Sequence, residues 1–243
     1  MIDLLPYVVL SIAAFSGALV SGLAGFAFSA VAGAILLHYF APIEAVPLMM
    51  ACSIAVQGAN LFVLRNTMQW KGSLVFIVGG VVGIPIAVYL LQNADTHVFR
   101  LGFGKFVALY ATYALFRPKL ANPQLIENRG RNALVGFGGG LVGGLTAMPG
   151  ALPTIWCDIN GVPKLQQRGL VQPFIAAMQV FALALMLSHN SVSSKVLIDF
   201  GICLPALIAG TAAGIILFGR INELAFKRTI LSVLLFSGLC LVV

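Results

Sequence analysis

One seven-residue segment occurs twice in this chain, and each copy lies inside a long apolar stretch. The first copy is Gly17-Ala18-Leu19-Val20-Ser21-Gly22-Leu23, and the second is Gly139-Gly140-Leu141-Val142-Gly143-Gly144-Leu145. Five of the seven positions are identical, and the other two exchange one small residue for another. The two copies are 122 positions apart, and so are Gln57 and Gln179. The chain is therefore predicted to contain two structural repeats.

The composition restricts where such repeats can fold. The chain has 243 residues, of which 60% are hydrophobic and 9% are charged. Charged residues normally make up about a quarter of a soluble domain. Apolar runs of about 18 residues or more indicate membrane spans, and they recur along the whole sequence. We predict an all-α integral membrane protein that crosses the cell membrane several times.

Each repeat begins with an apolar segment whose length fits neither one straight membrane span nor two. Residues 4–40 would form a helix of about 55 Å, too long for a hydrocarbon core of about 30 Å and too short for two full spans with a turn. We expect a hairpin of two shortened helices that meet near residues 22–28. The second copy, residues 132–159, is shorter, which favours a re-entrant hairpin that is interrupted at residues 146–153.

The remaining apolar runs are predicted to be ordinary spans, with a polar linker between the repeats. The first repeat is predicted at 1–116, the cytoplasmic linker at 117–131 and the second repeat at 132–243. With this linker inside the cell, eleven Lys and Arg residues face the cytoplasm and three face outward, as the positive-inside rule requires. Each repeat then crosses an odd number of times, so the two repeats are inverted. The spans are predicted at 45–64, 73–91, 98–116, 170–187, 196–217 and 224–243.

The two interrupted hairpins are the predicted binding site. A helix that begins inside the membrane has unpaired N–H groups and a positive dipole end. Two such ends, brought together by pseudo-symmetry, would attract a small oxyanion without a lysine. The alternative is that these glycines serve helix packing alone. The candidate binding residues here are Gly22, Gly25, Phe26, Ser29, Thr146, Pro149 and Gly150.

Three amides add to this candidate site. Gln57 and Gln179 lie at equivalent positions in apolar surroundings, and Asn60 follows Gln57 by about one helical turn. An amide in lipid must find hydrogen-bond partners, so these residues either line the substrate path or bond between helices.

Three acidic residues near predicted membrane ends are candidates for proton coupling: Glu44, Asp158 and Asp199. Intramembrane acids often mark proton relays, whereas acids in the headgroup layer need no such role. The histidines are scattered without ligand spacing, so neither a metal nor a cofactor is predicted.

At these residues the chain resembles the TauE/SafE family of sulfite exporters and related permeases. Gly136-Phe137-Gly138-Gly139-Gly140, with Pro149 and Pro153, is similar to the Gly-rich broken hairpin of that family. Gly22-Leu23-Ala24-Gly25 is similar to a degenerate first copy without the Gly triplet and the proline. Pro42 with Ala45-Val46, and the later turn that ends in Trp70, fit the family's first repeat. The resemblance implies transport of small sulfur-containing anions.

We therefore expect a secondary transporter, and not an enzyme, that exports a small sulfur-containing oxyanion or organosulfonate by alternating access. An anion channel, an intramembrane enzyme and a membrane subunit or sensor without cargo are the alternatives. The expected partners are the anion and the lipid bilayer, not nucleic acid, and a homo-oligomer is left open. The basic residues lie between apolar runs, which argues against nucleic acid.

Overall fold

The computed structural model describes residues 5–24, 27–63, 65–116, 128–189 and 192–217, with residues 231–232, 235–236 and 238–239 near the C-terminus. Within these ranges the regular structure is helical and contains no strand. The first half contains α1 (Leu5–Ala24), α2 (Phe28–Tyr39), α3 (Pro42–Val63), the short 3₁₀ helix η1 (Arg65–Thr67), α4 (Trp70–Asn93) and α5 (Thr96–Phe116). The second half contains α6 (Arg129–Thr146), α7 (Ala151–Ile159), α8 (Lys164–Ser188) and α9 (Ser194–Leu217).

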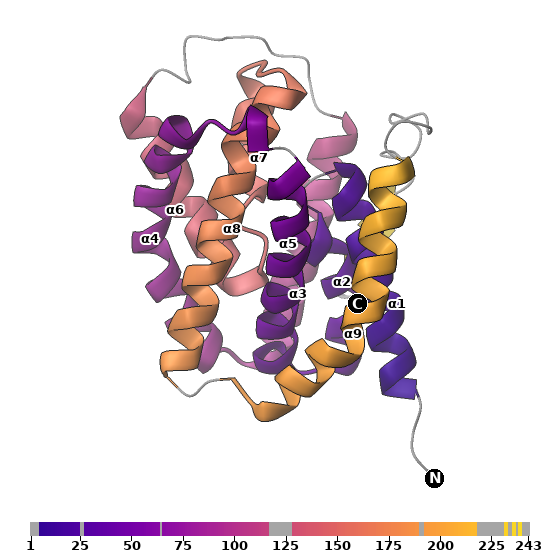
Figure 1. Cartoon of the computed structure of the whole chain (residues 1–243). Helices are drawn as coiled ribbons and strands as arrows, with labels where there is room; N and C mark the ends of the chain where they lie inside the picture. The colour runs from indigo at the N-terminus through magenta and orange to yellow at the C-terminus, as the bar shows by residue number, and fades with distance from the viewer. Residues whose placement is uncertain are drawn as a thin grey trace.

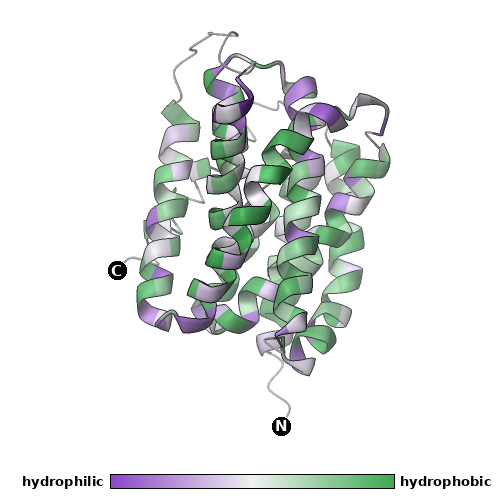
Figure 2. Cartoon of the chain, turned by 90° about the vertical axis from the view of Figure 1, so that its left-hand side faces the viewer, coloured by the Kyte–Doolittle hydropathy of each residue, from purple (hydrophilic) through white to green (hydrophobic). Residues whose placement is uncertain are grey.

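The helices form a bundle of the kind that crosses a membrane. Among the described residues, five helices are long and apolar enough for a crossing: α1, α3, α4, α8 and α9. Figure 2 shows apolar residues along most of the length of the bundle and hydrophilic residues mainly toward its two ends. The prediction of a multi-pass all-α membrane protein is confirmed.

The predicted spans agree with the helices that the structure describes. Helices α3, α4, α5, α8 and α9 coincide with the predicted spans to within a few residues, except that α8 begins six residues early. Helix α5, which contains Arg100 and Lys105, is not among the five helices that are long and apolar enough for a crossing. The last predicted span, residues 224–243, and most of the linker lie outside the described residues.

Both predicted hairpins are divided into two helices. The first consists of α1 with 20 residues and α2 with 12 residues, so α1 is longer than the shortened helix expected there. The second consists of α6 with 18 residues and α7 with 9 residues. Helices α2 and α7 are too short to cross a bilayer at about 1.5 Å per residue.

The two halves of the sequence exchange helices in the fold. Helix α1 packs along α9, and α6 packs along α4, so each first helix lies against a helix of the other half. Figure 1 shows these two pairs on opposite sides of the bundle. Helices α3 and α8 contact each other between the pairs.

In both exchanged pairs, a glycine of one helix lies close to a backbone carbonyl group of the other. A Cβ atom on Gly210 of α9 would lie 2.5 Å from the carbonyl oxygen of Phe15 in α1. A Cβ atom on Gly83 of α4 would likewise collide with the carbonyl oxygen of Phe137 in α6, and Phe137 is 122 positions after Phe15. Glycine lets the helix backbones approach this closely, as is common between membrane helices.

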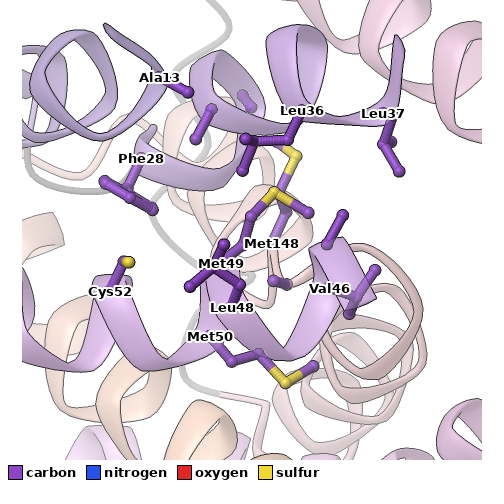
Figure 3. Packing of buried hydrophobic residues seen from close by; sticks show 14 of the residues in the cluster. Ala13, Phe28, Leu36, Leu37, Val46, Leu48, Met49, Met50, Cys52 and Met148 are labelled. Carbon is purple, nitrogen blue, oxygen red and sulfur yellow. The ribbon is translucent and has the colours of Figure 1, made fainter. Parts of the chain in front are cut away.

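A single large hydrophobic cluster joins the two breaks. It contains residues of α1, α2 and α3 from the first half and of α8 and α9 from the second. Figure 3 shows Met148, from the second break, among Leu36, Leu48 and Met49 of α2 and α3. The chain segment that interrupts one half is therefore packed against the other half.

Candidate substrate site

The second break begins where α6 ends in a left-handed residue. Ala147 has a φ of 56° and donates its N–H to the carbonyl oxygen of Gly143 at 2.8 Å. Pro149 cannot continue the helix because it has no N–H. A Cβ atom on Gly143 would lie 2.5 Å from Cβ of Pro149, so glycine is required there for the chain to fold back. Helix α7 then begins at Ala151.

The first break lies between α1 and α2. Gly25 and Phe26, two of the predicted site residues, fall outside the described residues. Ala27 precedes the first turn of α2, and no side chain caps that turn. Gly22 lies in α1, and a Cβ atom on it would be 3.1 Å from Cα of Gly214 in α9. Gly22 thus has a packing role in the α1–α9 pair.

Gln179 connects α8 to the second break. Its Nε2 donates to the carbonyl oxygen of Ala147 at 3.1 Å, and the side chain is buried. Gln57, at the equivalent position in α3, is buried too, and its Oε1 accepts from Nδ2 of Asn60 at 3.4 Å. The structure therefore brings Gln57 and Asn60 together and places Gln179 directly at a break.

Four buried polar atoms near the two breaks have no hydrogen-bond partner in the described part of the protein. Ser21 Oγ lies near the end of α1, and Ser29 Oγ lies in the first turn of α2. Thr154 Oγ1 lies in the first half of α7, and Gln179 Oε1 belongs to the amide that holds Ala147. Such a group costs about 1–3 kcal/mol when it is buried without a partner.

The remaining candidates from the second break are packed or already bonded. Thr146 Oγ1 donates to the carbonyl oxygen of Val142 at 2.7 Å within α6. A Cβ atom on Gly150 would lie 2.5 Å from Cδ1 of Ile175, so Gly150 lets the break approach α8. Pro149 contacts the face of α6 at Gly139 and Gly143. These residues shape the break.

Sequence reasoning missed Ser21 and Thr154 as candidate site residues. Ser21 stands inside the repeated segment, and its pairing with a glycine in the other copy suggested only a small residue. Thr154 directly follows the interrupted stretch. A hydroxyl that remains inside an apolar segment next to a helix break is the signal that could have identified both.

The acidic candidates lie in two places in the fold. Glu44 Oε2 forms an ion pair with Nζ of Lys195 at 3.1 Å, and Asp199 follows Lys195 by about one turn of α9. Asp199 is buried. Asp158, near the end of α7, accepts from Nε2 of Gln167 at 3.4 Å. Among the described residues, no group of three or more His, Cys, Asp and Glu side chains could hold a metal ion.

The fold defines a multi-pass helical membrane protein with two broken hairpins and buried polar side chains near them. The profile of the family described as sulfite exporter TauE/SafE matches residues 9–241, nearly the whole chain. The chain belongs to this family, whose members are membrane transporters of sulfite and related sulfur anions. No curated protein and no solved structure gives a significant match to the chain.

Proposed function

We propose that this protein is a secondary transporter that exports a small sulfur-containing oxyanion, bound between the two helix breaks. The observation that carries the proposal is that three buried hydroxyls near the breaks, those of Ser21, Ser29 and Thr154, have no partner among the described residues. A hydroxyl can rotate to donate to an anionic oxygen. The first turns of α2 and α7 add N–H groups and the positive ends of two helix dipoles.

This arrangement suits a small anion that must be released again. Neutral donors spread the negative charge without forming a buried ion pair, in which a lysine or arginine would hold the anion too tightly. Of the predicted residues, Gln179 and Ser29 are closest to this role, while Gln57 and Asn60 form an equivalent polar pair on α3. An inside-negative membrane potential would favour export by about 2.3 kcal/mol per charge per 100 mV.

The proposed mechanism is alternating access between two inverted repeats, with moving units that mix both halves of the sequence. The close backbone contacts of Gly210 with Phe15 and of Gly83 with Phe137 favour α1–α9 and α4–α6 as rigid pairs. The contact between α3 and α8 then becomes the place where the pairs shift relative to each other. Gln57 and Gln179 lie on these same two helices, α3 and α8.

The direct test is flux in proteoliposomes that contain the purified protein. Unlabelled sulfite on one side should accelerate the exit of labelled sulfite from the other, and the effect should saturate. Thermal-shift screening against sulfite, thiosulfate, sulfate, sulfoacetate and taurine would define the class of ligand. If no sulfur oxyanion binds or moves, the proposal is wrong.

An anion channel is the second candidate, because the same helix ends could line a continuous pore. Single-channel currents without counterflow would favour this alternative. The burial of the hydroxyls argues for the carrier, because a water-filled pore would leave Ser29 and Thr154 exposed.

A further inference from the structure

The amide of Gln179 has a fixed orientation at the second break. Its nitrogen lies 3.1 Å from the carbonyl oxygen of Ala147. A carbonyl oxygen can only accept a hydrogen bond, so the NH₂ group must face Ala147 and Oε1 must point elsewhere. Gln179 is 2% exposed, and Oε1 has no partner within the described ranges.

A fixed acceptor such as this amide oxygen differs from a rotatable hydroxyl. Ser29 and Thr154 can donate to an anionic oxygen, but Oε1 of Gln179 would repel one and would still lack a donor. The atom can be satisfied only by an N–H or O–H group. Its counterpart in the other half has such a donor, because Oε1 of Gln57 accepts from Asn60. Of these two equivalent amide oxygens, the one that lacks a hydrogen-bond donor is therefore Oε1 of Gln179, in the second half.

We propose that Gln179 selects oxyanions that also carry a hydrogen-bond donor. In this arrangement the anionic oxygens accept from Ser29 and Thr154, and the O–H or N–H of the ligand donates to Oε1 of Gln179. Hydrogen sulfite and the hydroxy- and aminoalkanesulfonates have this chemistry, whereas sulfate, thiosulfate and ethanesulfonate do not. The inference rests on the proposed function, because it places the anion between the two breaks.

Isethionate and ethanesulfonate form a matched pair of probes, since they differ by one hydroxyl group. For the purified wild-type protein, we expect isethionate to bind about tenfold more tightly, because the ligand hydroxyl satisfies a buried acceptor. Gln179→Met keeps the approximate size of the side chain and removes the acceptor, so the ratio of the two dissociation constants should fall to about one. If Gln179→Met does not fold, Gln179→Asn, which withdraws the acceptor by one methylene, should lower the ratio in the same way.

Gln57→Met is the control, and it should weaken both probes alike and leave their ratio unchanged. A structural role for Gln179 would also weaken both probes alike, so the ratio separates selection from folding. A second readout uses sulfite, whose affinity should fall as the pH rises and hydrogen sulfite loses its proton. This pH dependence should weaken in Gln179→Met.

Equal affinity of the wild type for the two sulfonates would overturn the inference, and so would an unchanged ratio in the Gln179 variants. In either case binding of both anions would leave the proposed function intact. Failure of every sulfur oxyanion to bind would instead overturn the proposed function itself.

Discussion

The ammonium nitrogen of Lys195 lies 3.1 Å from Oε2 of Glu44, and this ion pair joins the first turn of α9 to the first turn of α3. The same nitrogen lies 5.3 Å from the centre of the Phe40 ring, at the end of α2. Nη2 of Arg100, in the first turns of α5, donates to the carbonyl oxygen of Phe40 at 3.3 Å. Four helices from both halves therefore meet around Phe40 at one end of the bundle.

We expect this ion pair to matter more for motion than for stability. Both side chains are partly exposed, so Glu44→Gln should change the unfolding free energy by less than about 1 kcal/mol. A disulfide between Glu44→Cys and Lys195→Cys, in a background without the four native cysteines, should arrest flux in proteoliposomes until a reductant is added. Each single-cysteine variant under the same oxidant is the control. Undiminished flux in the cross-linked protein would show that this end does not open.

The glycines between the exchanged helices provide a test of the packing. A Cβ atom on Gly214 would lie 2.5 Å from the carbonyl oxygen of Leu19, so Gly214→Ala should destabilise the protein by about 1–3 kcal/mol. Gly201 lies on the same helix with nothing within 4 Å of its Cβ position. Gly201→Ala should therefore be neutral, or stabilising by up to about 1 kcal/mol. Thermal midpoints in detergent would measure both, and equal effects would contradict the observed α1–α9 contact.

Removing the buried hydroxyls should weaken binding of the anion without lowering the stability of the protein. Removing a group that has no partner should leave the thermal midpoint unchanged or raise it, because no hydrogen bond is lost. Ser29→Ala and Thr154→Val should nevertheless lower the affinity for sulfite by about tenfold each, if the hydroxyls donate to the anion. Ser16→Ala is the control, since Oγ of Ser16 already donates to the carbonyl oxygen of Ile12 at 2.7 Å. Unchanged affinity in both variants would remove the hydroxyls from the site.

Sequence patterns were sufficient to locate the helices, but they did not show which helices pack against each other. The long apolar runs and their charged boundaries located α3, α4, α5, α8 and α9, because hydrophobic length is set by bilayer thickness. Glycines indicated close approach, but Gly83 and Gly210 carry no information about which helix approaches. The exchange of α1 and α6 between the halves therefore emerged only from the structure.

The candidate site was predicted only in part, because the sequence shows which residues are polar but not how they pack. Gln179 was identified because an amide is conspicuous in an apolar segment, and its bond to Ala147 places it at a break. Ser21 and Thr154 were missed because hydroxyls usually bond to the carbonyl one turn earlier, as Thr146 does. Whether a hydroxyl lacks a partner depends on packing, which one sequence does not specify.

Ala147 is the backbone position at which we expect glycine to be tolerated and a larger residue to be destabilising. A non-glycine residue in the left-handed region costs about 1–2 kcal/mol. Ala147→Gly should relieve this strain, but glycine has greater chain entropy and lacks a methyl group that is buried in the core, so the stability should stay within about 1 kcal/mol of the wild type. The residue 122 positions earlier is Gly25. Ala147→Val places a β-branched side chain in the left-handed region and should be more destabilising, and a thermal midpoint of Ala147→Val at or above that of Ala147→Gly would contradict the argument.

Asp199 is the acidic residue for which we expect a role in coupling to protons. It is 6% exposed, whereas Glu44 is partly exposed and already paired with Lys195, and Asp158 accepts from Gln167. A buried carboxyl group within a membrane helix is a frequent element of proton relays. Asp199→Asn should keep sulfite counterflow, which needs no net proton movement, but should lose the acceleration of net flux by an imposed pH gradient. Asp199→Glu keeps a titratable group and should retain that acceleration. If Asp199→Asn responds to the gradient like the wild type, coupling does not use Asp199, and the membrane potential is left as the driving force for export.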